Sequence, residues 1–277
     1  MNLEDFLRLS LAEDIGSGDC TTWATVSARK KAKAHLLFKE DGVAAGMAIA
    51  RQLCHLHDPA LQFKARVQDG EEVEAGSVGF ELTGPARSVL TVERTLLNIL
   101  QRMSGIATKT RRMSKIIEPT GCKLLDTRKT TPLNRLLEKE AVRIGGGYNH
   151  RWGLYDMMLI KDNHIAASGG ITSAIQKALR YQKRHRLQLP IEIEVRNLME
   201  LEEVLACGQV HRIMLDNFSP AQLEKAVQRI GGLFETEASG GIDEHNILEY
   251  ALTGVHYVSS GALTHSVRSL DISLKIR

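Results

Sequence analysis

The spacing of apolar residues changes about 118 residues into the chain, which predicts two differently built parts. In the first part, residues 78–82 alternate apolar and polar side chains, as a half-buried strand does. A second apolar stretch at 34–38 predicts another strand, and an amphipathic helix is expected at the N-terminus. A longer helical pattern covers 91–117 and ends at Pro119-Thr120-Gly121. We therefore expect a mixed α and β domain over residues 1–118.

Beyond residue 118 the pattern becomes short apolar strands that alternate with amphipathic helices. Six strands are expected, at 123–126, 157–160, 191–195, 212–215, 233–238 and 255–259. Helices fit between them, for example at 132–144, 171–186 and 197–207, where Asn197 can cap its helix. Repeated strand–helix units favour a parallel sheet with right-handed crossovers, either closed as a barrel or open as a doubly wound sheet. The second domain is expected to cover residues 119–266.

The C-terminal segment alternates apolar side chains again, at Leu270, Ile272, Leu274 and Ile276. This alternation predicts a final strand. The strand could return to the sheet of the first domain or form an edge of the second. We group 267–277 with the first domain, although the pattern by itself fits both places.

Charge and composition exclude several classes of function. Lysine and arginine number 36 against 33 for aspartate and glutamate, a formal net charge of +3, so no global field for nucleic acid is evident. The four cysteines lie far apart without a Cys-x-x-Cys pair, which argues for reduced thiols rather than a zinc site or a disulfide framework. Nowhere do 18 apolar residues run together, and charged residues occur among the first ten. We expect a soluble, cytoplasmic protein without a targeting segment that binds neither nucleic acid nor membranes.

Polar side chains and glycines follow the expected strands of the second domain at their carboxyl ends. In chain order they are Arg128, Lys129, Lys161, Glu194, Asp216, Ser239-Gly240-Gly241 and Gly261. α/β barrels place their active sites at this end of the strands. Basic residues and glycines are concentrated between residues 126 and 164, where His150 and His164 also occur. This run predicts a binding site for a small, multiply charged anion.

Motifs spread over nearly the whole chain resemble the quinolinate phosphoribosyltransferase family. They are Glu13-Asp14, Gly18-Asp19, Thr21-Thr22, Glu93-Arg94-Thr95 with Asn98, Ser104 to Thr108, the 126–164 run, Glu192-Ile193-Glu194, Leu215-Asp216-Asn217, Ala238 to Gly241, and Gly261 to His265. The resemblance implies an α/β fold, with an N-terminal α/β sandwich domain and a C-terminal incomplete α/β barrel of about six strands. It also implies a homodimer in which each subunit completes the site of its partner, and it leaves a higher oligomer open.

The activity that the resemblance implies is a decarboxylating phosphoribosyl transfer in the de novo biosynthesis of NAD. Phosphoribosyl pyrophosphate and quinolinate would give nicotinate mononucleotide, pyrophosphate and CO₂. Mg²⁺ would accompany phosphoribosyl pyrophosphate, and no organic cofactor is expected.

By resemblance, cationic side chains would hold the two carboxylates of quinolinate. These are Arg94, which would reach across from the partner subunit, and Arg128, His150, Arg151 and Lys161.

The same resemblance assigns the remaining residues to the phosphoribosyl side of the site. Lys129 would lie toward the phosphates, and Ser239, Gly240 and Gly261 would offer hydroxyl or backbone donors to the 5′-phosphate. Glu194 and Asp216 would face the ribose hydroxyls and the magnesium pyrophosphate, directly or through water, because Mg²⁺ prefers hard oxygen ligands. The residues expected to assist catalysis are Lys129, Lys161, Glu194 and Asp216.

Electrostatics supports an anion site independently of the resemblance. Guanidinium groups meet carboxylates and phosphates through two parallel hydrogen bonds. If the cations converge, two of them about 4 Å apart repel by roughly 4 kcal/mol at an effective dielectric constant of about 20. Such crowding is tolerable mainly when an anion fills the centre.

Several of these residues also have simpler interpretations. Glu194 and Asp216 could be internal salt-bridge partners of the same cations. His150 could be a structural histidine that bonds to the backbone, and a structural role is the preferred interpretation of His164 and His265.

The chain departs from the family pattern after Pro132. The family usually has Gly-Leu-Arg there, whereas this chain has Leu133-Asn134-Arg135. The turn that enters the following helix is therefore expected to differ, which weakens any role for Arg135 more than it weakens the reaction.

Two competing functions remain open. A related phosphoribosyltransferase could use another acceptor, such as nicotinate, but a single carboxylate would not need so many cations. A non-catalytic barrel protein could sense a phosphorylated metabolite, but such a sensor would not need both Glu194 and Asp216 for a metal ion.

Overall fold

The structure is a computed structural model that describes residues 2–276, and the chain divides into two compact units. The first unit runs up to Arg111 and adds Thr130–Gly146 and the segment from Ser266 onward. The second consists of Arg112–Lys129 and Gly147–His265. The long helix α4 (Ala86–Ile117) contributes to both units. Within the described residues, no helix is long and apolar enough to cross a membrane.

The first unit is built on a four-stranded antiparallel sheet. Its strand order is β12 (Ile272–Ile276), β1 (Lys31–Phe38), β5 (Val78–Pro85) and β3 (Gln62–Ala65). Alternate residues of β1 are buried, as the sequence pattern predicts, and Leu36 and Phe38 are fully enclosed. A pair of short strands, β2 (Gly42–Val43) and β4 (Glu72–Val73), forms a separate ladder.

Helices accompany this sheet. They are α1 (Leu3–Ile15), α2 (Cys20–Thr25), α3 (Met47–His57), the first part of α4, and α5 (Arg135–Ile144). Asn2 caps α1 by accepting the N–H of Asp5, and Asp5 in turn accepts the N–H of Asn2. The sheet and its helices form the α/β sandwich that the sequence predicts.

The C-terminal alternation belongs to this first sheet. Strand β12 pairs antiparallel with β1, with Leu274 opposite Leu36. The apolar side chains of β12 need burial, and its backbone needs hydrogen-bond partners. Pairing with β1 at the edge of the sheet provides both. Of the two places that the sequence left open, the chain end occupies the first.

The second unit contains six parallel strands. In spatial order they are β6 (Lys123–Leu125), β11 (Tyr257–Ser259), β10 (Glu235–Ser239), β9 (Arg212–Asp216), β8 (Ile191–Val195) and β7 (Met158–Ile160). Strands β7 to β11 each lie beside their neighbours in sequence, and β6 lies beside β11. This circular order is that of a barrel left open between β6 and β7, which agrees with the predicted incomplete barrel rather than a doubly wound sheet.

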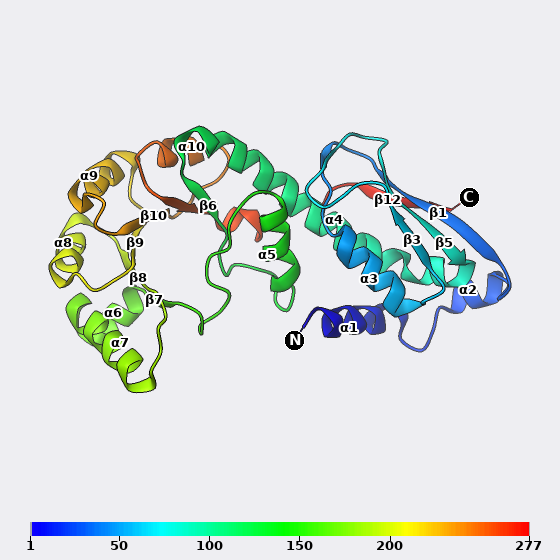
Figure 1. The fold of residues 1–277 in the computed structure, drawn as a ribbon, viewed down its shortest axis with the longest axis horizontal. Helices are drawn as coiled ribbons and strands as arrows, with labels where there is room; N and C mark the ends of the chain where they lie inside the picture. Colours follow the sequence, from blue (N-terminus) through cyan, green and yellow to red (C-terminus); the bar gives the residue numbers. More distant parts are fainter. Residues whose placement is uncertain (1, 277) are drawn as a thin grey trace. The chain divides into compact units, whose positions relative to one another are not determined.

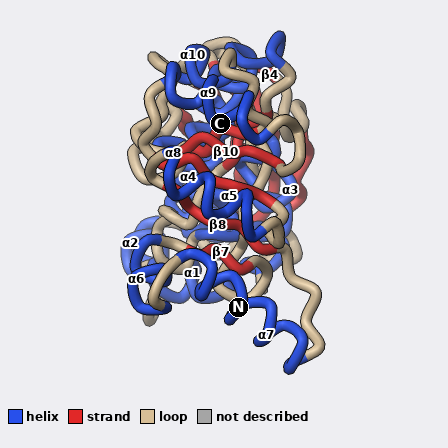
Figure 2. The backbone as a smooth tube through the Cα atoms, turned by 90° about the vertical axis from the view of Figure 1, so that its left-hand side faces the viewer, coloured by secondary structure: helices blue, strands red, loops and turns tan. Residues whose placement is uncertain are grey.

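Helices cover the outer side of these strands. They are α6 (Asp162–Ser168), α7 (Ile171–His185), α8 (Leu198–Cys207), α9 (Pro220–Ile230) and α10 (Ile247–Ala251). In Figure 1 the strands β7 to β10 follow an arc with α7, α8 and α9 outside it. Figure 2 shows β10, β8 and β7 in that order down the same sheet. Asn197 caps α8 through the N–H of Glu200, as the sequence predicts.

The free edge of β6 is partly covered by the segment Tyr148–Arg151. Tyr148 donates its N–H to Leu124 O at 2.8 Å, and its carbonyl accepts the N–H of Asp126 at 3.0 Å. These bonds form a short parallel bridge between Tyr148 and Leu125. The segment therefore lies at the opening of the barrel and satisfies backbone groups that would otherwise be exposed.

Residues 130–146 differ from the predicted domain bounds, which placed them with the barrel. They pack with the first unit, where Glu138 is fully buried and pairs with Arg102 of α4 at 2.8 Å. A buried carboxylate needs such a partner, so the ion pair fixes α5 beside α4. The sequence could not show this, because the pairing residues lie on separate elements.

The turn before α5 explains the departure from the family pattern. The helix begins at Arg135 rather than at Pro132, because Leu133 adopts φ 65°, a left-handed conformation that glycine tolerates far better than leucine. The Leu133 side chain is 76% exposed, so the leucine gains little burial in return.

We expect Leu133→Gly to stabilise the protein by about 1 kcal/mol, since it removes left-handed strain at a small cost in chain entropy. Calorimetry should show the melting temperature of the first unit rising by roughly 2–4 °C. Leu233 is similarly exposed (75%) and is not among the non-glycine residues with positive φ. Leu233→Gly is therefore the matched control, and an equal rise in both variants would contradict the explanation.

Candidate active site

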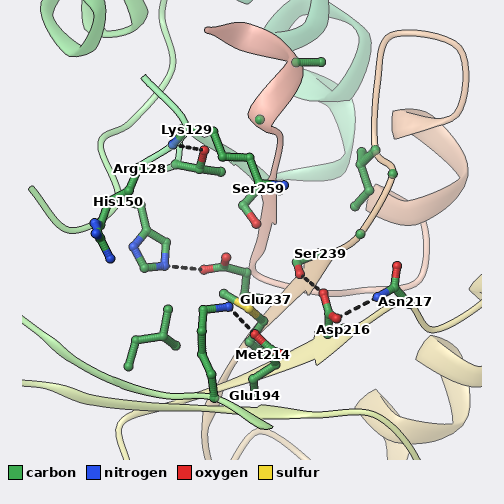
Figure 3. Close-up of a pocket in the computed structure, with 18 of the residues that line it drawn as sticks. Arg128, Lys129, His150, Glu194, Met214, Asp216, Asn217, Glu237, Ser239 and Ser259 are labelled. Carbon is green, nitrogen blue, oxygen red and sulfur yellow. Dashed lines mark hydrogen bonds and ion pairs between the residues drawn. The ribbon is translucent and has the colours of Figure 1, made fainter. Parts of the chain in front are cut away.

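A cavity of about 660 Å³ lies within the second unit. It is lined by residues that follow the carboxyl ends of the strands. The predicted site residues among them are Arg128, Lys129, His150, Arg151, Lys161, Glu194, Asp216, Ser239, Gly240 and Gly261. Figure 3 labels Arg128, Lys129, His150, Glu194, Asp216 and Ser239. Arg94, the remaining predicted residue, is exposed on α4 in the first unit and does not line this cavity. The fold thus brings together nearly all of the residues that the strand-end pattern selected.

One wall of the cavity is cationic. Arg151 is only 8% exposed, and its Nε is buried without a hydrogen-bond partner in the described residues. Burial lowers the pKa of the Arg151 guanidinium, and the positive charge of Arg128 lowers it further. A desolvated guanidinium beside a second cation is stabilised when an anion meets both. This wall therefore has the character of an anion site.

Lys161 connects the cationic wall to the acidic one. It follows β7, and its ammonium group forms an ion pair with Glu194 at the end of β8. His164 accepts the backbone N–H of Lys161 at 3.0 Å, in keeping with the structural role preferred for that histidine. Glu194 is thus a salt-bridge partner, as its simpler interpretation held, and it also lines the cavity.

Asp216 is held by two neighbours at the carboxyl end of β9 (Figure 3). Its Oδ1 accepts the Ser239 hydroxyl at 2.5 Å, and its Oδ2 accepts Asn217 Nδ2 at 2.6 Å. Gly240 (φ 102°) permits this arrangement, because a Cβ there would lie 2.3 Å from Asn217 Oδ1. The carboxylate is therefore fixed in orientation, and lone pairs remain on both oxygens for a further ligand.

Gly261 brings the loop after β11 close to the loop after β6. A Cβ at Gly261 would lie 2.8 Å from Lys129 Cδ, and Thr264 donates its hydroxyl to Lys129 O at 2.9 Å. Small residues thus allow the backbone to approach a ligand at this end of the cavity. His265 also lines the cavity, although a structural role was the preferred interpretation of its sequence position.

His150 lines the cavity, but its ring nitrogens face the protein. Nε2 lies 3.0 Å from Glu192 Oε2 and 3.4 Å from Glu237 Oε2, and Nδ1 accepts the N–H of Arg151 at 2.7 Å. Burial lowers the pKa of His150, but these two carboxylates outweigh it and raise the pKa to about 9. The N–H of Arg151 meets Nδ1 at 2.7 Å, a contact that favours an unprotonated Nδ1 and therefore opposes this shift.

Glu192 and Glu237, with Arg212, are residues that the sequence analysis assigned no role. Both carboxylates are fully buried in the barrel, and Arg212 pairs with Glu237 at 3.1 Å. Burial and the charge of Glu237 raise the pKa of Glu192 to about 7. Burial disfavours the charged form of Glu237 and so raises its pKa. The nearby His150 and Arg212 outweigh burial and keep the pKa of Glu237 below its usual value. The Glu-x-Glu spacing at 192–194 could have indicated the position of Glu192, since it puts both side chains, those of Glu192 and Glu194, on the same face of the strand.

Comparisons with known proteins agree with this fold. The family model described as quinolinate phosphoribosyl transferase, C-terminal domain, matches residues 106–275, and the N-terminal domain model matches residues 19–104. The decarboxylating quinolinate phosphoribosyltransferase 1b of Nicotiana tabacum is 44% identical, over 99% of this chain and 82% of the relative. The probable carboxylating nicotinate-nucleotide pyrophosphorylase of Bacillus subtilis (strain 168) is 43% identical, over 100% of this chain and 94% of the relative.

A solved structure extends the agreement to three dimensions. The crystal structure of NadC from Streptococcus pyogenes superposes with a TM-score of 0.93 at 42% identity. The match covers 99% of this chain and 96% of that protein. Both units of this chain therefore have counterparts in a single solved protein.

Proposed function

The chain belongs to the quinolinate phosphoribosyltransferase family, and from this premise we propose that it catalyses the decarboxylating transfer of phosphoribose to quinolinate. Phosphoribosyl pyrophosphate is the donor, and the products are nicotinate mononucleotide, pyrophosphate and CO₂. The reaction supplies the de novo biosynthesis of NAD. The observation that carries the proposal is the buried Arg151 guanidinium beside Arg128, a pair suited to an anion with two adjacent carboxylates.

Quinolinate would bind at the cationic wall. Arg128 and Arg151 can each meet a carboxylate through two hydrogen bonds, and Lys161 adds a third cation beside them. Neutralising the carboxylates holds the pyridine ring in one orientation, with its nitrogen directed toward the acceptor position. Such positioning is the main contribution expected from these residues.

Phosphoribosyl pyrophosphate would occupy the other side of the cavity. Ser239, Gly240 and Gly261 offer hydroxyl and backbone donors to the 5′-phosphate, and Lys129 extends from the adjoining loop. Glu194 and Asp216 face the ribose hydroxyls. Asp216 is suited to this role because Ser239 and Asn217 already fix its orientation.

The donor set at this end also fits Mg²⁺. Glu194 and Asp216 provide hard carboxylate oxygens from adjacent strands in one cavity, and Mg²⁺ in proteins is typically held by one or two carboxylates together with substrate phosphates. These two residues would hold the ion, directly or through water. Bound there, Mg²⁺ would neutralise charge on the pyrophosphate.

The chemistry requires charge stabilisation rather than a covalent intermediate with the enzyme. As pyrophosphate leaves, positive charge develops on the ribosyl carbon, and the carboxylates of Glu194 and Asp216 would stabilise it. The pyridine nitrogen then bonds to that carbon and becomes a pyridinium. The bond between C2 and its carboxylate then breaks and releases CO₂, because the electron pair left on C2 is stabilised by the adjacent positive nitrogen. A proton from water adds to C2 and gives nicotinate mononucleotide.

The proposal is tested by mixing the protein with quinolinate, phosphoribosyl pyrophosphate and Mg²⁺ and following nicotinate mononucleotide and CO₂. We expect equal amounts of both products. Turnover with nicotinate but not with quinolinate would assign another acceptor. No turnover with either acceptor would indicate a protein that binds its ligand without catalysis.

The homodimer belongs to the same proposal, with Arg94 donated to the site of the partner subunit. Arg94 is exposed on α4, as a residue that acts on another chain must be. A mixture of Arg94→Ala and Lys161→Met subunits should then regain up to about a quarter of wild-type activity, because only one site in a mixed dimer keeps both residues. Sedimentation should first demonstrate subunit exchange. Exchange without recovery of activity would indicate that each subunit has a self-contained site.

A reducing compartment, the cytoplasm, is also part of the proposal. It rests on the four cysteines, Cys20, Cys54, Cys122 and Cys207, which are free in the structure.

A further inference from the structure

The two guanidinium groups of the cationic wall come from separate segments of the chain. Arg128 lies in the loop after β6, and Arg151 ends the segment Tyr148–Arg151 at the opening of the barrel. Like charges repel, and the charge of Arg128 contributes to the lowered pKa of Arg151. The two groups therefore do not hold each other in place, and contacts elsewhere in the protein must fix their separation.

The sheet itself holds the second segment by a single bridge. Tyr148 donates its N–H to Leu124 O at 2.8 Å, and its carbonyl accepts the N–H of Asp126 at 3.0 Å, as in a parallel ladder. The next bond of such a ladder would run from the N–H of His150 to the main-chain carbonyl of Asp126. The N–H of His150 meets the side chain of Asp126 instead, so the regular ladder ends after Tyr148.

The Asp126 carboxylate takes over from the ladder at this point. Its Oδ1 accepts the N–H of His150 at 2.9 Å, and its Oδ2 accepts Asn149 Nδ2 at 2.6 Å. Asp126 is fully buried and is not among the residues that line the cavity. A buried carboxylate is costly unless it is well paired, so contacts with this segment are where its contribution is expected.

The place of Asp126 in the chain connects these contacts to Arg128. Only Thr127 separates Asp126 from Arg128, and Arg151 directly follows the His150 that Asp126 holds. One buried residue thus joins the loop that carries the first guanidinium to the segment that carries the second.

We propose that Asp126 is a positioning residue, which ties these two segments together and thereby sets the separation of the Arg128 and Arg151 guanidiniums to that of two adjacent carboxylates. The inference rests on the proposed function for the identity of the ligand. Asp126 acts through the two arginines and does not itself touch the substrate.

Two simpler roles for Asp126 lead to different results. If it only closes the barrel, its replacement should lower the melting temperature and weaken both substrates alike. If it only balances charge, removing its negative charge near two guanidiniums should strengthen the binding of an anion. A positioning role alone predicts weaker binding that is confined to quinolinate.

The test is Asp126→Asn. Asparagine keeps an oxygen for the N–H of His150 but turns an amide group toward Asn149 Nδ2, so that two donors face each other. We expect the dissociation constant of quinolinate, measured by calorimetry, to rise about tenfold, the usual effect of losing one such contact. The KM for phosphoribosyl pyrophosphate should change by less than about twofold, since the donor side of the cavity keeps its contacts.

A reciprocal exchange provides the rescue. In the double variant Asp126→Asn with Asn149→Asp, the amide and the carboxylate change places, so both hydrogen bonds and the total charge are retained. This variant should recover most of the quinolinate affinity. Asp69→Asn is the matched control, because Asp69 also accepts backbone N–H groups, those of Gly46 and Met47, and does not line the cavity.

Three results would overturn the proposal. They are unchanged or tighter quinolinate binding by Asp126→Asn, an equal loss for both substrates, and a reciprocal variant that binds no better than the single one.

Amide hydrogen exchange of the wild type tests the contact even if the variants do not fold. In the absence of ligands, the N–H of His150 should be protected as strongly as the N–H of Tyr148, because both are bonded within the protein. Rapid exchange at His150 beside protection at Tyr148 would show that Asp126 does not hold the segment, and would also overturn the proposal. Inactivity of the wild type on quinolinate would instead refute the proposed function, and it leaves this measurement unaffected.

Discussion

Replacing Lys161 with methionine should lower kcat/KM for quinolinate by about 100- to 1,000-fold, as removal of one preorganised charge from an active site typically does. Methionine preserves the length of the side chain and removes the ammonium group. The ammonium is the only partner of Glu194 among the ion pairs of the described residues. Its loss would leave a nearly buried carboxylate facing anionic substrates, so the expected effect combines lost attraction with new repulsion.

Two further variants separate these causes. Lys183→Met is the matched control, because Lys183 is exposed on α7 away from the cavity lining. Calorimetry of the double variant Lys161→Met with Glu194→Gln should show quinolinate affinity partly recovered if repulsion contributes; turnover is not the measure here, because Glu194 is also assigned to the phosphoribosyl side. A single Lys161→Met variant with wild-type kcat/KM would remove Lys161 from the site.

Arg151→Ala should weaken quinolinate binding by about 30-fold, equivalent to roughly 2 kcal/mol, because a buried charge-assisted contact typically contributes that much. The loss should appear in the dissociation constant measured by calorimetry. Arg151→Lys should lie between wild type and alanine, since lysine keeps the charge but not the planar fork. The exposed Arg180 of α7 gives the control substitution, Arg180→Ala.

Stability distinguishes a binding role for Arg151 from a structural one. Burial and the charge of Arg128 lower the pKa of Arg151, which means that folding disfavours its charged form. The alanine variant should therefore lose affinity without a lower melting temperature. A fall in melting temperature together with unchanged affinity would indicate that Arg151 serves the fold and not the ligand.

Most of the architecture could be predicted from the sequence. Strand β8 coincides with the expected 191–195, and the other strands of the barrel differ from their expected bounds by a few residues at most. Such strands are recognisable because burial on both faces selects short apolar runs. The polar residues that follow these runs were also recognisable, since the carboxyl ends of parallel strands meet at one edge.

Other features could not be read in this way. The bounds of helix α3 were not predicted, although a helix surface was the preferred interpretation of His55 and His57, which lie in it. The packing of segment 130–146 with the first unit was not predicted, because the Arg102–Glu138 ion pair joins residues on separate helices. A charged residue in a helix looks the same in sequence whether it is solvated or buried against a partner.

The sequence by itself determined the two kinds of domain, the succession of strands and helices along the chain, and the cations and carboxylates that follow the strands. The periodicity of apolar residues carries that information locally. Only the tertiary structure decided that β12 pairs with β1, that Leu133 adopts a left-handed conformation, and that His150 faces Glu192 and Glu237. These features depend on contacts between distant segments, and the energy of such contacts comes from burial and pairing that no local pattern records.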